Sequence, residues 1–245
     1  MDLLKPFGQY CLLFYKAIRS STELSTYREN FFRELVKIGY DSVAIIVLVG
    51  TFTGSVLTLQ TAYQIGSYLV PQYVIGSIVS TSIFIELAAA VMSLVLAGRV
   101  GARIATELGS MRVSEQIDAL EAMGFNSVSF LVVPRVVSVI LMFPILYLIA
   151  SLFGILGGLV TAWLSGAVPV AEFMRGARMF FFPRDIAFGM IKSMVFGYII
   201  TSIACFKGYY ASGGAEGVGK NTTRATVLGS VFVLLADLVL AAILL

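Results

Sequence analysis

The sequence predicts an all-α membrane protein with about five transmembrane helices and an amphipathic interfacial helix at its N-terminus. Of its 245 residues, 58% are hydrophobic and only 13% are charged, which is more apolar than an ordinary soluble domain. The apolar residues form long runs, each able to cross a hydrocarbon core of about 30 Å. We expect one membrane domain over residues 1–245, because this length leaves little room for a sizeable soluble domain.

Two amphipathic segments form residues 1–40, before the first apolar run. In residues 1–20, apolar side chains recur at helical spacing, with Lys5 and Lys16 on the opposite side. This pattern is typical of a helix that lies in the membrane interface. Residues 27–40 repeat the pattern. Two interpretations remain open, a plain membrane anchor and an elbow that braces the first span.

Five apolar runs follow and predict the membrane spans. They cover about residues 41–59, 73–97, 130–163, 186–206 and 223–245. The first contains Gly50 and Gly54, whose spacing permits close contact between helices. The third is longer than one crossing requires, so we expect it to tilt or to break near Pro144 or the glycines that follow. Residues 165–185 predict an outer connection with room for a short interfacial helix.

The basic residues predict the orientation. They precede the first span and flank the central segment, residues 99–129, and the last connection. The two connections on the opposite side hold only Arg175, Arg178 and Arg184. The positive-inside rule therefore places the N-terminus and both charged segments in the cytoplasm.

The central segment predicts a short helix over residues 115–123. Ser114 is a good N-cap residue, and Gly124 can end the helix in a left-handed conformation. One face of this helix is acidic and the other is apolar, close to Val113. The acidic face holds Glu115, Asp118 and Glu121, and the apolar face holds Ile117 and Leu120. A two-faced helix between two spans predicts contact with another protein.

The composition and motifs argue against catalysis and nucleotide binding. The chain has no histidine, and its two cysteines, Cys11 and Cys205, fit no metal-binding spacing. Gly214 to Lys220 matches the start of a phosphate-binding loop, but Asn221 replaces the required Ser or Thr and an apolar run precedes it. We therefore expect no nucleotide at this segment, whose glycines predict a tight cytoplasmic turn.

Glu86 is the clearest candidate functional residue within a predicted span. A charged side chain at that depth costs about 2.5–3.5 kcal/mol, so it should face a wet cavity or an opposite charge. Lys192 and Asp237 also lie within predicted spans. The lysine could pair with either carboxylate, but for Glu86 the cavity is the preferred interpretation.

Residues at the end of the first span mix apolar and hydrogen-bonding side chains, as an amphiphile would require. Together with Glu86, the candidate lipid contacts are Leu57, Gln60, Gln64 and Tyr68. Ordinary packing in the membrane interface explains this pattern equally well.

The stretch ELGSMRVSEQIDALEAMG, residues 107–124, resembles the signature loop of the MlaE family. Members of this family are permease subunits of ABC-type phospholipid transporters. The resemblance extends from about residue 31 to the C-terminus and includes KGYYASGGAEGVGKNTTRAT, residues 207–226. Where the family often has Glu-Leu-Gly-Pro, this chain has Glu-Leu-Ala-Ala from Glu86 onward. The loss of Gly and Pro removes an expected kink.

The resemblance implies a transport subunit that is not itself an enzyme. It would work as a homodimer in the cell inner membrane, with phospholipid held between the protomers, and would bind no nucleic acid. Its expected partners are a cytoplasmic ABC ATPase that holds the ATP and magnesium, a small STAS-domain protein and a periplasmic MCE-domain protein. The residues expected to couple to the ATPase are Glu107, Met111, Arg112, Glu115, Gln116, Ile117, Asp118, Leu120, Glu121 and Gly124. The alternative is a stand-alone secondary transporter or channel that uses Glu86 or Asp237.

Overall fold

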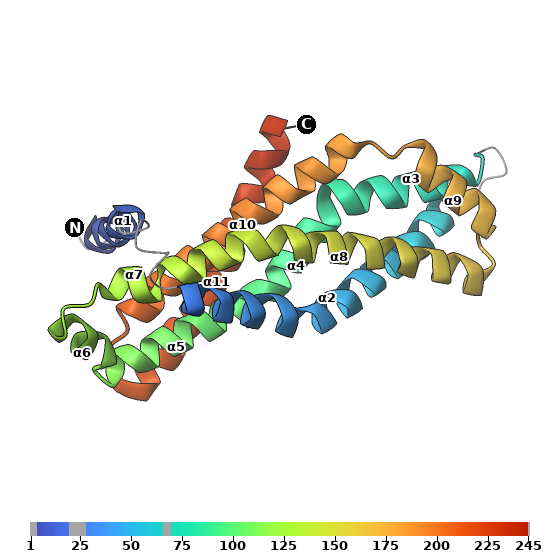
Figure 1. Ribbon diagram of the computed structural model, residues 1–245. Coiled ribbons are helices and arrows are strands. Elements are labelled where there is room, and N and C mark those ends of the chain that lie inside the picture. Colours follow the sequence, from blue (N-terminus) through green and yellow to red (C-terminus); the bar gives the residue numbers. More distant parts are fainter. Residues whose placement is uncertain (1–3, 20–27, 66–69, 245) are drawn as a thin grey trace. The chain divides into compact units, whose positions relative to one another are not determined.

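The structure is a computed structural model that describes residues 4–19, 28–65 and 70–244. All regular secondary structure in these ranges is helical (Figure 1). Within these ranges, five helical stretches are long and apolar enough to cross a membrane. They are Arg28–Gln64, Tyr73–Val113, Ser127–Ser165, Pro183–Tyr209 and Gly214–Ile243. The prediction of a multi-pass, all-α membrane protein is therefore confirmed.

The N-terminal part contains the expected amphipathic helix, α1 (Leu4–Arg19). The second amphipathic segment is different from the prediction, because it is the first part of one continuous helix, α2 (Arg28–Gln64). Glu34, a charged residue of this part, has a partner on another helix, which favours continuing the helix before the apolar run. Its carboxylate accepts a hydrogen bond from Arg103 over 3.1 Å.

The second span also continues beyond its expected end. It comprises α3 (Tyr73–Ser82), the π-helical turn η2 (Ile83–Leu87), α4 (Ala88–Leu96), a second π turn, η3 (Ala97–Gly101), and α5 (Ala102–Val113). Two of the charged residues after residue 97, Arg103 and Glu107, are held in ion pairs within the protein. Charge in this sequence therefore marks the end of the apolar run but not the end of the helix.

The central segment then forms α6 (Gln116–Ala122), α7 (Ser127–Leu131) and α8 (Val133–Ser165). Gly124 has the expected left-handed conformation, with φ of 81°. The predicted N-cap is wrong, because Ser114 Oγ bonds back to the Ser110 carbonyl and Glu115 takes φ of 59° at the start of α6. Pro144 lies inside α8 without breaking it.

The rest of the chain forms α9 (Val170–Met179), α10 (Pro183–Tyr209) and α11 (Gly214–Leu244). The predicted tight turn from Gly214 to Lys220 is wrong, because these residues form the first turns of α11. Lys220 pairs there with Glu216, one helical turn earlier, over 2.6 Å. The chain turns into α11 through left-handed backbone conformations at Gly213 and Gly214.

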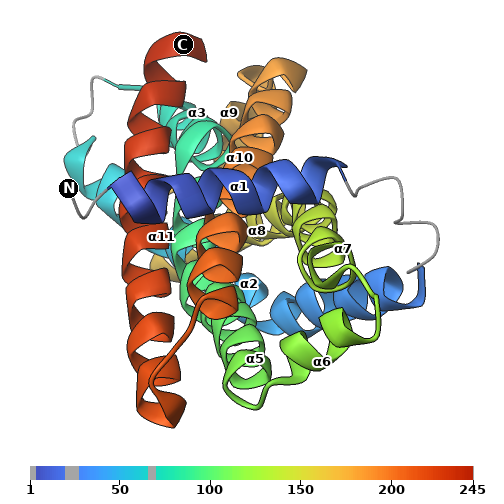
Figure 2. The ribbon, with the colours of Figure 1, turned by 90° about the vertical axis from the view of Figure 1, so that its left-hand side faces the viewer.

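The chain divides into two compact units. Unit 1 consists of Met1–Tyr40, Leu94–Met142 and Val195–Val239. Unit 2 consists of Asp41–Ser93, Phe143–Met194 and Leu240–Leu245. In unit 1, α1 lies across α10 (Figure 2), where Tyr10 donates a hydrogen bond to Ser202 over 2.9 Å.

Unit 2 is packed through glycines where helices cross. A Cβ atom added to Gly54 on α2 would lie only 1.8 Å from the carbonyl oxygen of Gly154 on α8. A Cβ atom on Gly176 of α9 would lie 1.8 Å from the carbonyl oxygen of Tyr73 on α3. These helices can approach so closely only because side chains are absent there.

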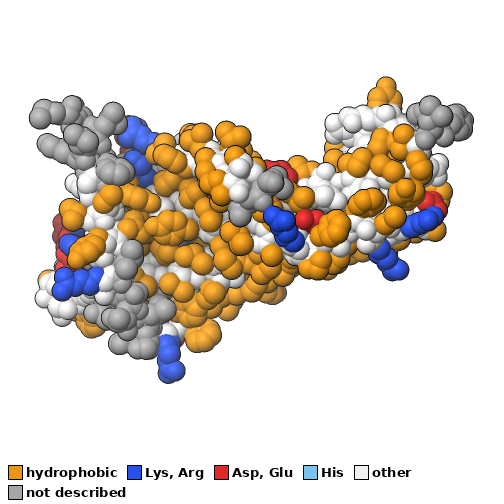
Figure 3. All heavy atoms as spheres, turned by 90° about the horizontal axis from the view of Figure 1, so that it is seen from above, with side chains coloured by type: hydrophobic (Ala, Val, Ile, Leu, Met, Phe, Trp, Pro, Cys, Tyr) orange, Lys and Arg blue, Asp and Glu red, His pale blue; other side chains and the backbone are white. Residues whose placement is uncertain are grey.

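The outer surface of the spans is apolar. Leu48, Phe52 and Val56 recur every four residues on α2, and each is more than half exposed. Figure 3 shows hydrophobic side chains over most of the face in view, with few charged ones between them. Such large exposed apolar surfaces are typical of contact with lipid.

Candidate functional site

Glu86 lies on the π turn η2 in the middle of the second span. Its Oε2 atom accepts a hydrogen bond from Lys192 Nζ over 2.7 Å. The lysine side chain is 0% exposed, whereas that of Glu86 is 38% exposed. Lys192 of α10 is therefore the opposite charge that a carboxylate within a span was expected to need. Glu86 is the member of the pair that reaches the surface.

The π turn itself is held by neighbouring helices. A π turn inserts one extra residue and disturbs the regular hydrogen bonding of the helix. Tyr147 of α8 donates a hydrogen bond to the Phe84 carbonyl over 2.7 Å. Gly189 of α10 leaves room for this contact, since a Cβ there would lie 2.2 Å from the tyrosine oxygen. The family's Gly and Pro after the glutamate would kink this helix, and this chain lacks them. The π turn η2 makes the helix irregular at the same place instead.

A surface depression of about 390 Å³ lies beside Glu86. Its lining combines the carboxylate and two hydroxyl groups with apolar side chains. The lining residues are Leu57, Thr81, Ser82, Ile85, Glu86 and Leu87. Thr81 and Ser82 also line a second depression of about 270 Å³ that reaches Phe180. Glu86 therefore has both an ion-pair partner and a depression, the two alternatives that the sequence left open.

The other candidate lipid contacts lie in different places. Leu57 lines the depression beside Glu86. Gln60 and Gln64 are exposed on α2 but are not among the lining residues that the structure describes. Tyr68 falls outside the described residues.

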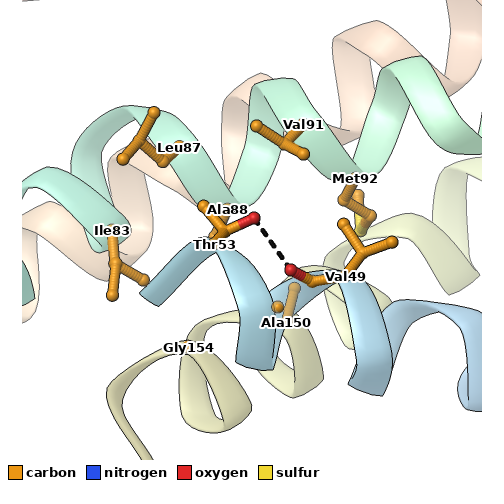
Figure 4. A pocket seen from close by; sticks show the side chains of 10 residues that line it. Val49, Thr53, Ile83, Leu87, Ala88, Val91, Met92, Ala150 and Gly154 are labelled. Carbon is orange, nitrogen blue, oxygen red and sulfur yellow. Dashed lines mark hydrogen bonds between the residues drawn. The ribbon is translucent and has the colours of Figure 1, made fainter. Parts of the chain in front are cut away.

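A smaller void lies where α2, α4 and α8 meet (Figure 4). Its volume is about 10 Å³, room for roughly one water molecule. Thr53 is its main polar group, and its hydroxyl already donates to the Val49 carbonyl over 2.8 Å. This void is a packing defect and too small for a substrate.

The short helix α6 lies between α5 and α7 in unit 1 (Figure 2). Ile117 is 0% exposed, so the expectation that it forms part of an outward apolar face is wrong. Leu120 is half-buried. The exposed apolar side chains follow or precede the helix instead, and they are Val113, Met123 and Phe125.

We call the exposed group formed by Val113, Glu115, Asp118, Met123 and Phe125 the α6 surface. The sequence analysis missed Met123 and Phe125. Their position beside the left-handed Gly124 is the signal that could have found them. A tight turn carries its neighbours away from the packed face of the helix, so large apolar residues there remain exposed.

The remaining residues of the expected coupling group are held by local contacts. Arg112 donates to Asp118 over 2.5 Å, and Gln116 donates to Ser114 over 3.0 Å. Met111 is half-buried at the end of α5. Glu107 belongs to a network of charges described below.

Glu121 has a separate environment at the end of α6. Its Oε1 atom accepts hydrogen bonds from Ser127 Oγ over 2.6 Å and from the Tyr209 hydroxyl over 3.0 Å. Those two hydroxyls are themselves 2.7 Å apart. The bond from Ser127 lowers the pKa of Glu121 most, with further lowering by Tyr209, Arg112 and Lys16, while partial burial opposes them.

A four-residue charge network joins α2, α5 and α8. Arg103 contacts Glu34 over 3.1 Å and Glu107 over 3.4 Å. Arg135 contacts Glu107 over 3.2 Å and Glu34 over 3.7 Å. Each carboxylate therefore meets both arginines. In the sequence these residues were only charges flanking apolar runs, because nothing there shows which of them meet.

The site residues do not form a metal centre in the part of the chain that the structure describes, where no three His, Cys, Asp or Glu side chains gather as ligands. The polar groups are suited to binding and to helix positioning. An apolar depression with one ion pair can hold an amphiphile, and the exposed α6 surface can hold a protein.

Comparison with known proteins supplies family relationships. The family described as Permease MlaE matches residues 31–243. A "Probable ABC transporter permease protein" of Rickettsia conorii is 35% identical over 94% of this chain and 88% of its own length. One with the same description from Synechocystis is 36% identical over 87% of this chain and 81% of its own. The chloroplastic protein TRIGALACTOSYLDIACYLGLYCEROL 1 of Arabidopsis thaliana is 35% identical over 86% and 60%, respectively.

Proposed function

Because the chain belongs to the MlaE permease family, we propose that it is the membrane-spanning permease subunit of an ABC transporter for phospholipids. It moves them between the cell inner membrane and an MCE-domain carrier on the outer side. The observation that carries this substrate class is the depression beside Glu86, which places charge, hydroxyls and apolar surface together within a span.

The depression suits an amphiphile in chemical terms. Leu57, Ile85 and Leu87 offer apolar contact to acyl chains, while Glu86 and the neighbouring hydroxyls offer hydrogen bonds to a head group. Two protomers of a homodimer would enclose the lipid between them. The Arabidopsis relative is named after a glycolipid, which favours lipid as the substrate without favouring phospholipid in particular.

The energy for transport comes from a separate ATPase subunit in the cytoplasm, where ATP and magnesium are bound. The α6 surface supports this assignment, since it combines exposed apolar side chains with the acids Glu115 and Asp118. Interfaces of this kind bury apolar anchors within a charged rim. A STAS-domain protein completes the cytoplasmic part of the complex.

Lipid transfer by the reconstituted complex tests the role of Glu86. We expect Glu86→Gln to lower stability less than an apolar replacement, because the amide oxygen can still accept a hydrogen bond from Lys192, and to keep ATPase association while impairing lipid transfer through the lost charge. Glu172→Gln is the matched control, because Glu172 is a partly exposed carboxylate on α9 away from the depression. Full transfer activity in Glu86→Gln would contradict the assignment.

Purification from mildly solubilised membranes tests the ATPase partnership. We expect Met123→Glu with Phe125→Glu to remove the co-purifying ATPase, whereas Met179→Glu, at an exposed methionine on α9, should retain it. If the lone subunit instead transports a substrate down an ion gradient, the alternative of a secondary transporter is correct and the ATPase assignment is wrong.

A further inference from the structure

Glu121 is exposed like the other acids beside α6, but its carboxylate also accepts hydrogen bonds from two hydroxyls on other helices. The two hydroxyls that it accepts belong to side chains that are nearly buried, Ser127 at 2% and Tyr209 at 8% exposure. Ser127 begins α7 and Tyr209 ends α10. The three groups therefore form a triangle of close polar contacts among three helices, in which both hydroxyls donate to the carboxylate.

We propose that Glu121 is a positioning residue that fastens α6 to the end of α10, and that it does not contact the ATPase. The proposal rests on the proposed function, since α6 matters for transport only if a partner docks there. It changes the role expected for Glu121 from the sequence, where it was grouped with the docking acids.

The length of α6 explains why such a fastening is needed. A helix of seven residues is not stable by itself, because the cost of forming its first turn is not recovered. The helix is also bounded by left-handed residues at Glu115 and Gly124, so the chain changes direction at both of its ends. Buried Ile117 and the triangle are what hold it in one orientation.

The two ends of α6 are held by bonds of different strength. At its start, Asp118 pairs with Arg112, but both side chains are substantially exposed, at 53% and 35%. Such exposed pairs contribute little. At its end, the exposed carboxylate of Glu121 accepts two hydrogen bonds from nearly buried hydroxyls, and an ionised acceptor strengthens such bonds. The firm attachment is therefore to α10, one of the membrane spans.

Through this attachment, a displacement of α6 would be transmitted directly to the membrane span α10. A partner that displaces α6 would move the end of α10 with it, because Tyr209 is the last residue of that helix. Without the triangle, α6 could shift without pulling on Tyr209, and α10 would stay in place. The partner would still bind, but its movement would not reach the span.

Two substitutions separate this role from a docking role. Tyr209→Phe removes one hydroxyl from the triangle and leaves the charge of Glu121 unchanged. Glu121→Gln removes the charge but keeps an oxygen that can accept both hydrogen bonds. A fastening role predicts that Tyr209→Phe is severe and Glu121→Gln mild, and a docking role predicts the reverse. Tyr210→Phe is the matched control, since Tyr210 is 40% exposed and lies outside the triangle.

Hydrogen exchange of the isolated permease measures the fastening without any partner. We expect amides of residues 116–122 to exchange about tenfold faster in Tyr209→Phe than in Tyr210→Phe, with Glu121→Gln close to the control. Equal exchange in the two tyrosine variants would overturn the proposal. Because no ATPase is involved, this result is independent of whether the proposed function is correct.

Lipid transferred per ATP hydrolysed then measures the consequence in the complete complex. We expect Tyr209→Phe to lower this ratio about tenfold while ATPase association stays within about twofold of the unchanged protein. Loss of association in Glu121→Gln together with a normal ratio in Tyr209→Phe would assign Glu121 to docking and overturn the proposal. Should Tyr209→Phe fail to fold, Ser127→Ala removes the other hydroxyl and carries the same expectations.

Discussion

Both units hold charged side chains among apolar helices, but they arrange them differently. In unit 1, two arginines share two carboxylates, and the arginines also donate to the carbonyls of Lys37 and Leu131. In unit 2, one lysine meets one glutamate at η2. The first arrangement involves three helices and four charges, and the second involves two helices and two charges.

The difference indicates two different roles. In the four-residue network each oxygen of Glu34 and Glu107 contacts a different arginine, so the helices are tied together by several contacts at once. Such a cluster fixes a structure. The Glu86–Lys192 pair has one buried partner and one partner at a depression. The carboxylate is open at the depression, and this opening is the feature that the proposed lipid site uses.

The largest effect should follow removal of the carboxylate in unit 2. Glu86→Leu leaves the lysine charge, 0% exposed, without the ion pair, so we expect a loss of stability on the order of 3–5 kcal/mol. Thermal unfolding in detergent measures it. The double variant Glu86→Leu with Lys192→Met should recover most of the loss, and a double variant as unstable as the single one would contradict this account.

A somewhat smaller effect should follow from crowding a helix crossing in unit 2. Gly54→Ala places a Cβ atom 1.8 Å from a backbone oxygen of Gly154, which cannot move alone. We expect a loss of about 3 kcal/mol. The control in unit 1 is Gly101→Ala, where the nearest atom is a side-chain methyl of Ile200 at 3.1 Å that can adjust. Equal unfolding temperatures for the two variants would show that the α2–α8 crossing relaxes freely.

A single substitution in the unit 1 network should cost less than one in the unit 2 pair. Arg103→Met leaves Arg135 in contact with both Glu34 and Glu107. We expect about 1–2 kcal/mol, reduced further by the 27% exposure of the arginine. Adding Glu34→Leu should cost less than the sum of the two single losses. Strict additivity in urea unfolding would argue against a shared network.

The smallest effect concerns protonation of Glu121. Its pKa in the folded protein is lowered from 4.5, chiefly by the hydrogen bond from Ser127. The ionised form therefore contributes stability above its unfolded pKa, and this contribution is lost as the pH falls through the lower folded value. Carboxyl NMR titration should give a midpoint below 4.5, and Ser127→Ala should raise it. An unchanged midpoint in that variant would remove Ser127 as the cause.

Particular residues show how far sequence reasoning reached. Glu86 stood out because a carboxylate is costly in an apolar run, and Lys192 was recognised as a candidate partner for the same reason. The short helix α6 was predicted within one residue at each end. The direction of its faces was not, because Ile117 is buried and Glu121, although exposed, bonds to Tyr209, which is distant in sequence.

The sequence by itself determined the class of protein, the number of spans and the family. The length of an apolar run is a local property that bilayer thickness requires. A long family motif can likewise be recognised directly from the order of its residues. Only the tertiary structure decided where helices end and which charges meet. Helices α2 and α5 extend past their apolar runs because partners from other helices neutralise their charged residues, among them Glu34 and Arg103. The π turn at Glu86 likewise depends on Tyr147 and Gly189, from two other helices, which no local pattern could bring together.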